Sequence, residues 1–249
     1  MNNGKIIKEL SGHSGCKIFL KENESGLYVE KTGNIERNFN QMKFLYDACY
    51  PVPKIFSSDE NSITMEYIHG LDMKNYLIHN NTHQLFNFLC QLLDSFSEDS
   101  EIKDYTETYY NKLKWLDDCD EMPFTKEELI AKLPKLLVKS TYHGDLTLEN
   151  IMYTDPGFHL IDPVTIEYDS YIFDIAKLRQ DLECKWFLRN TNIKLEVKLQ
   201  NLQNKLRQHY ESAFDDNLLI LMLLRVYLHT KQGDDNHKFI MKEINRLWK

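Results

Sequence analysis

Three oxygen-bearing side chains fall within one short window of the chain. Residues 140–164 have the sequence STYHGDLTLENIMYTDPGFHLIDPV, which contains Asp145, then Asn150, and Asp162 after an apolar run. A carboxylate within hydrogen-bond reach of an alcohol can orient it and accept its proton. Mg²⁺ prefers hard oxygen ligands and is usually held by one or two carboxylates together with substrate phosphates. The window therefore predicts a phosphoryl-transfer site, with Asp145 as catalytic base and Asn150 and Asp162 as Mg²⁺ ligands.

The same Asp and Asn, with four residues between them, form the catalytic loop of protein kinases, where an Asp behind a short strand also binds metal. Here Gly144 stands where protein kinases have an Arg, and Pro163 and Val164 replace the usual Phe-Gly. A protein kinase is disfavoured because no Ala-Pro-Glu ends an activation segment after Asp162.

The run HGDLTLENI, followed by LIDP and by YIFDIAKL, resembles the aminoglycoside phosphotransferase and choline kinase-like family of small-molecule kinases. This resemblance implies ATP and Mg²⁺ as cofactors and a small molecule with a hydroxyl group as acceptor. It also implies an α+β, bilobal protein kinase-like fold, with a small antiparallel-sheet N-lobe and a mostly helical C-lobe. Asp174, in the last of these runs, is expected to brace the catalytic loop.

The N-terminal segment alternates like an antiparallel hairpin, with strands expected at 5–10, 16–21 and 27–31. Gly12 and Gly15 lie between the first two strands, where a glycine loop lets backbone N–H groups approach phosphates. A plain hairpin turn is the alternative. Lys31 ends the run LYVEK, the place where kinases carry the strand Lys that contacts the α and β phosphates. The alternative for Lys31 is a solvated strand end.

A helix is expected over residues 35–48, and it should supply an acidic partner for Lys31. In the family that the chain resembles, a Val-Pro pair like Val52-Pro53 typically follows this helix. Alignment on that pair brings Asn38 or Gln41 to the position where the partner of the Lys is expected. Glu36, one turn earlier, is the nearest carboxylate and is therefore the predicted partner.

The run SITMEYI, residues 62–68, alternates like a strand and ends before His69 and Gly70. It resembles the last N-lobe strand and hinge of the family. Met65 is then the gatekeeper, and the Glu66 carbonyl and the Ile68 N–H are the expected contacts to adenine. An ordinary core strand would have the same pattern. The remaining chain is mostly helical, so we expect an N-lobe at residues 1–69 and a C-lobe at 70–249.

Composition argues against a membrane-spanning, a secreted or a nucleic-acid-binding protein. The chain has 249 residues, 42% of them hydrophobic, and a net charge of −8. No apolar run approaches the ~20 residues that span a bilayer, and the first residues do not resemble a signal peptide. Five widely spaced Cys predict reduced thiols in a cytoplasmic protein. The negative charge disfavours nucleic acid as a partner, and nothing indicates a membrane partner.

The sequence allows three hypotheses for the acceptor molecule. Carboxylates for an aminoglycoside are available at Glu167, Asp169, Asp181 and Glu183, and an aromatic cage for choline or ethanolamine at Tyr168, Tyr171, Trp186 and Tyr210. The run MEYIHGLDMKNYL together with HGDLTLENI is most similar to small kinases of bacterial surface-polysaccharide metabolism, which implies a sugar or related polyol. A nucleotide-binding pseudokinase scaffold is the alternative from another class.

Overall fold

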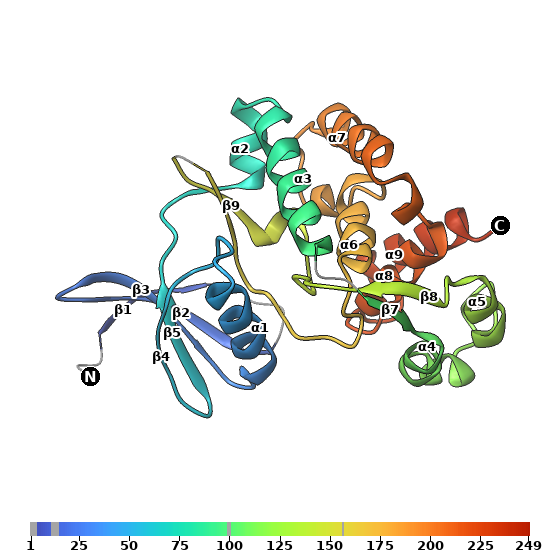
Figure 1. The fold of residues 1–249 in the computed structure, drawn as a ribbon, viewed down its shortest axis with the longest axis horizontal. Helices are drawn as coiled ribbons and strands as arrows, with labels where there is room; N and C mark the ends of the chain where they lie inside the picture. The colour runs from blue at the N-terminus through green and yellow to red at the C-terminus, as the bar shows by residue number, and fades with distance from the viewer. Residues whose placement is uncertain (1–3, 11–14, 99–100, 156) are drawn as a thin grey trace. The chain divides into compact units, whose positions relative to one another are not determined.

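The N-terminal strands form one antiparallel sheet in the computed structural model, which describes residues 4–10, 15–98, 101–155 and 157–249 (Figure 1). Its strands are β1 (Lys5–Leu10), β2 (Lys17–Asn23), β3 (Gly26–Thr32), β4 (Ile55–Ser58) and β5 (Ser62–Glu66). Their order in the sheet is β1-β2-β3-β5-β4. The expected hairpin is thus present, and Gly26, with a φ of 114°, follows the turn that joins β2 to β3.

The central position of β3 fixes where Lys31 lies. Lys31 is opposite Ile18 of β2 and Ile63 of β5 in the strand register. Its side chain is buried, so it is not the solvated strand end that the sequence allowed. The helix α1 (Glu36–Asp47) follows, and its buried face consists of Asn38, Gln41, Met42 and Leu45. Two polar residues on a buried helix face are unusual, and both contact the segment 162–165 of the same unit: Asn38 donates to Asp162, and Gln41 accepts from Thr165.

A second, small sheet has the order β10-β9-β6 and consists of β6 (Leu71–Asp72), β9 (Ile151–Tyr153) and β10 (Phe158–Leu160). Leu71 pairs with Tyr153, and the ring of Tyr76 packs 4.6 Å from that of Tyr153. Because of this pairing, the chain divides into unit 1, residues 1–76 and 149–166, and unit 2, residues 77–148 and 167–249. Residues 70–76 and 149–166 thus belong to the same unit as the N-terminal sheet, and the lobe boundary at residue 69 stays a prediction.

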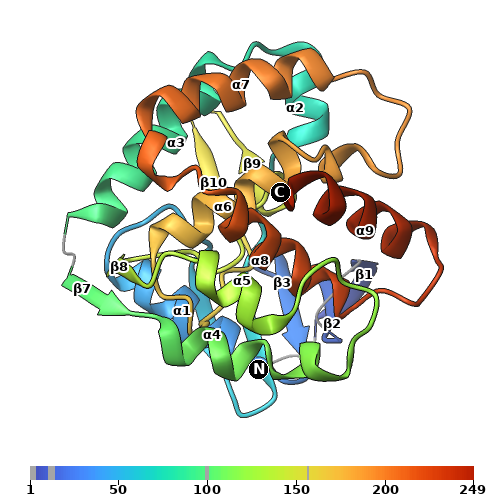
Figure 2. The ribbon, with the colours of Figure 1, turned by 90° about the vertical axis from the view of Figure 1, so that its right-hand side faces the viewer.

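Unit 2 is built from helices around α6 (Tyr171–Leu182), as Figure 2 shows. All residues of this helix from Phe173 to Leu182 are buried. The other α-helices of this unit are α3 (His83–Ser97), α4 (Thr106–Lys112), α5 (Lys126–Lys132), α7 (Glu196–His209), α8 (Asp216–Tyr227) and α9 (Asp235–Leu247). The helix α2 (Met73–His79) crosses the boundary between the two units, and its last three residues belong to unit 2. The strands β7 (Glu101–Asp104) and β8 (Leu136–Lys139) form a two-stranded antiparallel sheet. The helix α6 contacts α3, α7 and α8. Within the described ranges, no helix is both long and apolar enough to cross a membrane.

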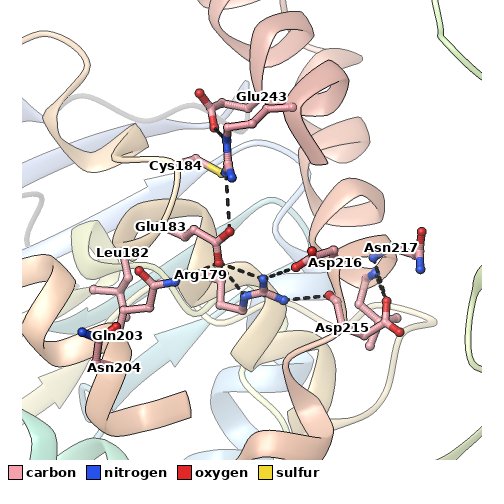
Figure 3. A network of polar contacts seen from close by, with 12 residues as sticks. Arg179, Leu182, Glu183, Cys184, Gln203, Asn204, Asp215, Asp216, Asn217 and Glu243 are labelled. Carbon is pink, nitrogen blue, oxygen red and sulfur yellow. Dashed lines mark hydrogen bonds and ion pairs between the residues drawn. The ribbon is translucent and has the colours of Figure 1, made fainter. Parts of the chain in front are cut away.

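A buried arginine connects α6 to its neighbours (Figure 3). The Arg179 side chain is 1% exposed and forms ion pairs with Glu183 at 2.8 Å and Asp216 at 2.6 Å. It also donates to the backbone oxygen of Asp215 at 2.7 Å, while Gln203 of α7 donates to Glu183 at 2.9 Å. A buried charge is tolerated only when it is paired and hydrogen-bonded. These contacts hold α6 in a defined position among the helices of unit 2.

Candidate active site

The carboxylate of Asp174 holds the loop that carries Asp145. Asp174 lies in the first turn of α6 and is buried. Its Oδ2 accepts a hydrogen bond from the His143 N–H at 2.5 Å, and its Oδ1 accepts one from the Gly144 N–H at 2.9 Å. Gly144 has a φ of 87°, a conformation that glycine adopts at little cost. This is the bracing geometry that the sequence predicted for Asp174.

The other end of the loop is fixed to the same helix. The backbone N–H of Leu148 donates to Asp181 Oδ2 at 2.7 Å. Asp174 and Asp181 are seven residues apart and therefore lie on one face of α6, two turns from each other. The helix thus anchors the loop on both sides of Asp145.

Two cations lie beside Asp145. The Lys177 ammonium is 3.2 Å from Asp145 Oδ1, and the Arg225 guanidinium of α8 donates to the Gly144 carbonyl at 3.1 Å. The Asp145 side chain is 35% exposed, whereas that of Lys177 is 8% exposed. The carboxylate is therefore open to solvent on one side and bound to a buried ammonium on the other.

The environments of the two carboxylates move their pKa values apart. Burial raises the pKa of Asp145, but Lys177, Arg225 and His143 outweigh this effect and hold that pKa below its ordinary value. Burial raises the pKa of Asp174 to about 7, although the two backbone N–H groups and Arg225 oppose the rise. A divergence of this kind separates the roles of paired acids. Asp145 is the carboxylate that stays ionised, as a hydroxyl-orienting residue must.

Unit 1 holds the predicted phosphate and metal residues. Lys31 Nζ lies 2.5 Å from Asp162 Oδ1, and the Lys31 side chain is 3% exposed. Asn38 of α1 donates to the same oxygen at 3.0 Å and to the Pro163 carbonyl at 2.9 Å. Asp162 has a φ of 56°, an uncommon conformation that clusters at functional sites. The structure thus brings Lys31 and Asp162 together.

The structure does not support Glu36 as the partner of Lys31. Glu36 is exposed in the first turn of α1, where an acidic side chain stabilises the helix dipole. Within the part of the chain that the structure describes, no ion pair joins Glu36 to Lys31, and Lys31 pairs with Asp162 instead. Asn38, the residue nearer the position expected from alignment, reaches Asp162 from the buried face of the helix.

The hairpin of β9 and β10 places Asn150 beside Asp162 along the backbone. Ile151 pairs with Leu160, and the Ile161 N–H donates to the Asn150 carbonyl at 2.9 Å. Asn150 therefore faces the residue before Asp162 at the open end of one hairpin. Both residues belong to unit 1, whereas Asp145 belongs to unit 2. Four residues separate Asp145 from Asn150 in the sequence.

The donor set of this hairpin fits Mg²⁺. No group of three His, Cys, Asp or Glu that could hold a metal occurs among the described residues. One carboxylate and one amide suit an ion that keeps water and substrate phosphates as its other ligands. The Asp162 side chain is 38% exposed, and no described residue donates to its Oδ2. Asp162 and Asn150 would hold the ion, which would supply charge neutralisation at the phosphates.

The remaining predicted nucleotide contacts stay predictions. Met65 is buried in β5 opposite Val29 and Ile55. The N–H of Glu66, the last residue of β5, donates to the Lys54 carbonyl at 2.9 Å, and Ile68 is buried. Gly15 has a φ of 73°, and Gly12 lies outside the described residues.

Four further residues contact the predicted ones: Lys177, Asp181, Arg225 and Asn38. Sequence reasoning gave no role to Lys177 or Arg225, and it considered Asp181 and Asn38 only for other roles. For two of them a signal existed. Asp174, Lys177 and Asp181 are spaced i, i+3 and i+7 within a helix that is otherwise apolar on that face. Three charges on a buried helix face indicate partners from another segment, because buried charges need them.

Each unit holds part of the predicted residue set: unit 2 carries the helix-anchored carboxylate of Asp145, and unit 1 carries Lys31, Asn150 and Asp162. Residues 11–196 match the Phosphotransferase enzyme family. Since the match covers most of the chain, the protein belongs to this family. No curated protein sequence gives a significant match to the chain.

Solved structures show the same fold at low sequence identity. An aminoglycoside phosphotransferase APH(4)-Ia mutant in complex with ADP and hygromycin B has a TM-score of 0.66 and 12% identity, over 96% of this chain and 92% of that one. A putative fructosamine-3-kinase from Thermobifida fusca has a TM-score of 0.61 and 15% identity, over 99% and 95%. ADP-bound aminoglycoside phosphotransferase APH(2'')-Ib has a TM-score of 0.57 and 14% identity, over 99% and 93%. The family resemblance, the enzyme class and the α+β kinase-like fold predicted from the sequence are thereby confirmed.

Replacement of Asp174 by alanine should destabilise unit 2. The change leaves the His143 and Gly144 N–H groups buried without an acceptor, and each such group costs about 1–3 kcal/mol. We expect the free energy of unfolding to fall by at least about 2 kcal/mol in urea. Tryptophan fluorescence reports this transition because Trp115, Trp186 and Trp248 all lie in unit 2.

Asp120→Ala is the matched control, since Asp120 is an exposed aspartate of the same unit. Its effect should stay within about 0.5 kcal/mol. If Asp174→Ala were as stable as this control, the two hydrogen bonds would not carry the loop.

Proposed function

We propose that this phosphotransferase moves the γ-phosphoryl group of ATP, with Mg²⁺, to a hydroxyl group of a small molecule. The observation that carries the proposal is the partly exposed carboxylate of Asp145, on a loop that α6 anchors on both sides and beside cations that hold its pKa below the ordinary value. Such a carboxylate can orient an acceptor hydroxyl and take its proton. The nucleotides in the APH(4)-Ia and APH(2'')-Ib structures support ATP as the donor.

In this proposal the residues of unit 1 bind the nucleotide. Lys31 contacts the α and β phosphates, with backbone N–H groups of the segment at Gly12 and Gly15. Asn150 and Asp162 hold Mg²⁺, which neutralises charge on the phosphate oxygens. The backbone at Glu66 and Ile68 contacts adenine, beside Met65. These residues position the donor, and Asp145 positions the acceptor.

The acceptor that we favour is a sugar or related polyol, and contacts in unit 2 support a neutral molecule. The carboxylates that an aminoglycoside would need already have protein partners. Asp169 pairs with Lys103 at 2.5 Å, Glu167 with Lys112 at 2.7 Å, and Glu183 with Arg179 at 2.8 Å. The fourth carboxylate, that of Asp181, accepts from the loop backbone.

Three of the four aromatic residues considered for a choline or ethanolamine cage, Tyr168, Trp186 and Tyr210, already have partners within the protein. Trp186 stacks against the Arg189 guanidinium at 4.1 Å, and the Tyr210 ring packs against that of His209, with centroids 4.7 Å apart. Tyr168 is buried against Phe173, with ring centroids 5.0 Å apart. A cage needs open ring faces, so these contacts favour a neutral acceptor over a quaternary amine.

Bacterial surface-polysaccharide metabolism, suggested by the family resemblance, is the setting we propose for this sugar or polyol. We also propose a cytoplasmic location. It is supported by the five cysteines, none of which forms a disulfide within the described ranges.

A panel of neutral sugars and polyols, amino alcohols and aminoglycosides tests the proposal through ADP release. We expect acceptor-dependent release with a neutral sugar or polyol, and a loss of about 10²–10⁴-fold in Asp145→Ala. Nucleotide affinity should persist in that variant, because Asp145 faces the acceptor. Asp155→Ala, an exposed aspartate in the turn between β9 and β10, is the control and should keep full activity.

Three outcomes would contradict parts of this account. Release only with cationic acceptors would refute the neutral acceptor, and near wild-type turnover in Asp145→Ala would refute the base. Nucleotide binding without any release, to water or to the panel, would favour a pseudokinase scaffold.

Removal of the metal ligands should abolish the effect of Mg²⁺ on nucleotide affinity. In calorimetric titrations of ATP, we expect Mg²⁺ to tighten binding to the wild type but not to Asp162→Ala. Because that variant also leaves the Lys31 ammonium without its carboxylate, Asn150→Ala is the second variant, and it keeps the Lys31 pair intact. An unchanged Mg²⁺ response in both variants would rule out the metal assignment.

A further inference from the structure

Lys177 of α6 has no role in the reaction as proposed above, although it contacts Asp145. It lies three residues after Asp174 and four before Asp181, so all three side chains share one face of the helix. The outer two hold the backbone of the catalytic loop, at His143, Gly144 and Leu148. The middle one reaches the Asp145 carboxylate, with Nζ and Oδ1 3.2 Å apart.

Because Lys177 is buried, its ammonium depends on the contact with the Asp145 carboxylate. Its side chain is 8% exposed, and an ammonium removed from water needs an opposite charge at close range. Asp145 supplies that charge, while its own side chain stays open enough to meet a substrate. A surface ion pair would have little effect on either partner, but this pair has one buried member and a fixed backbone on both sides.

We propose that Lys177 is a positioning residue for phosphoryl transfer, which holds Oδ1 of Asp145 and thereby fixes the direction and the charge of the carboxylate that orients the acceptor hydroxyl. This inference rests on the proposed function. In the reaction, the acceptor oxygen bonds to the γ-phosphorus while the bond from that phosphorus to the bridging oxygen breaks. ADP leaves, and the hydroxyl proton passes to Asp145 and then to water.

The ion pair also sets when the proton moves. Protonation of Asp145 would leave the Lys177 ammonium buried without its counter-charge, so early removal of the hydroxyl proton is costly. Transfer late in the reaction, as the new phosphorus–oxygen bond forms, avoids this cost. A loose, metaphosphate-like transition state needs an oriented nucleophile more than a deprotonated one. Lys177 therefore makes Asp145 an orienting carboxylate and a weak base.

Four groups act on the charge of Asp145, and they define the expected pH dependence. Burial raises its pKa, whereas Lys177 of α6, Arg225 of α8 and His143 of the loop lower it, with Lys177 the largest of the three. Asp174 is the facing carboxylate. Because the result lies below the ordinary value of 3.8, the wild type should show no titration of Asp145 above about pH 4. Loss of Lys177 should raise this pKa.

The test is a carbon-13 NMR titration of the Asp side-chain carboxyl carbons, with the Asp145 resonance assigned from Asp145→Asn. We expect Lys177→Met to move the Asp145 midpoint upward by at least one pH unit, and Lys177→Arg to keep it near the wild-type value. Lys185→Met is the matched control. Lys185 follows α6 and bonds to the Leu182 carbonyl, and its loss should leave the midpoint unchanged.

Turnover gives a second readout, with ADP release to the acceptor found in the panel or to water. In Lys177→Met the acid limb of kcat/KM should move upward with the Asp145 midpoint, kcat should fall about ten-fold or more, and nucleotide affinity should not change. An Asp145 midpoint that is the same in the wild type and in folded Lys177→Met would overturn the proposal.

If Lys177→Met does not fold, Lys177→Gln removes the same charge with a polar side chain and is judged by the same midpoint. The titration needs no substrate, so it separates this proposal from the proposed function. A protein without phosphotransfer activity could still show the shift. An active protein without the shift would refute the role of Lys177 alone.

Discussion

The buried carboxylate of Asp174 is the constraint on which the catalytic loop depends. A loop cannot place a reacting group accurately unless its backbone hydrogen-bonding groups have fixed partners. At His143 and Gly144 those partners are the two oxygens of Asp174, which belongs to a helix whose residues are buried from Phe173 to Leu182. The rigidity of α6, secured in turn by the Arg179 contacts, is thus passed to the loop.

One face of α6 therefore both fixes the backbone of the loop and places a positive charge beside Asp145. Asp174 and Asp181 fix the backbone before and after Asp145, and Lys177 between them contacts its carboxylate. The burial that raises the pKa of Asp174 would do the same to Asp145 without nearby cations. Two carboxylates in one environment thereby differ: Asp174 accepts from the loop backbone, whereas the pKa of Asp145 stays below its ordinary value. In the reaction that we propose, this difference keeps Asp145 ionised to orient a hydroxyl group at neutral pH.

The local motifs were predictable from the sequence because their chemistry is encoded at short range. Residue type and spacing were enough to single out Asp145, Asn150 and Asp162, and periodicity was enough to predict the strand that ends at Lys31. The kinase-like fold was predicted from the family resemblance of the same motifs. Glu36 was chosen because the alignment offered no carboxylate at the expected position, but it is exposed, and the buried face of α1 presents Asn38 instead. Lys177 and Arg225 come from distant helices, and only tertiary packing brings them to the loop. The acceptor pocket could not be predicted from the sequence for the same reason, since helices far apart in the chain contribute its residues.

Hydrogen exchange at the His143 and Gly144 amides tests most directly whether Asp174 holds the loop. Both N–H groups donate to a buried carboxylate, so the account predicts slow exchange, with protection like that of the amides within α6. Exchange of these two amides at the rate of an unstructured peptide, in a protein whose helices remain protected, would show that the loop is not held and would contradict the account.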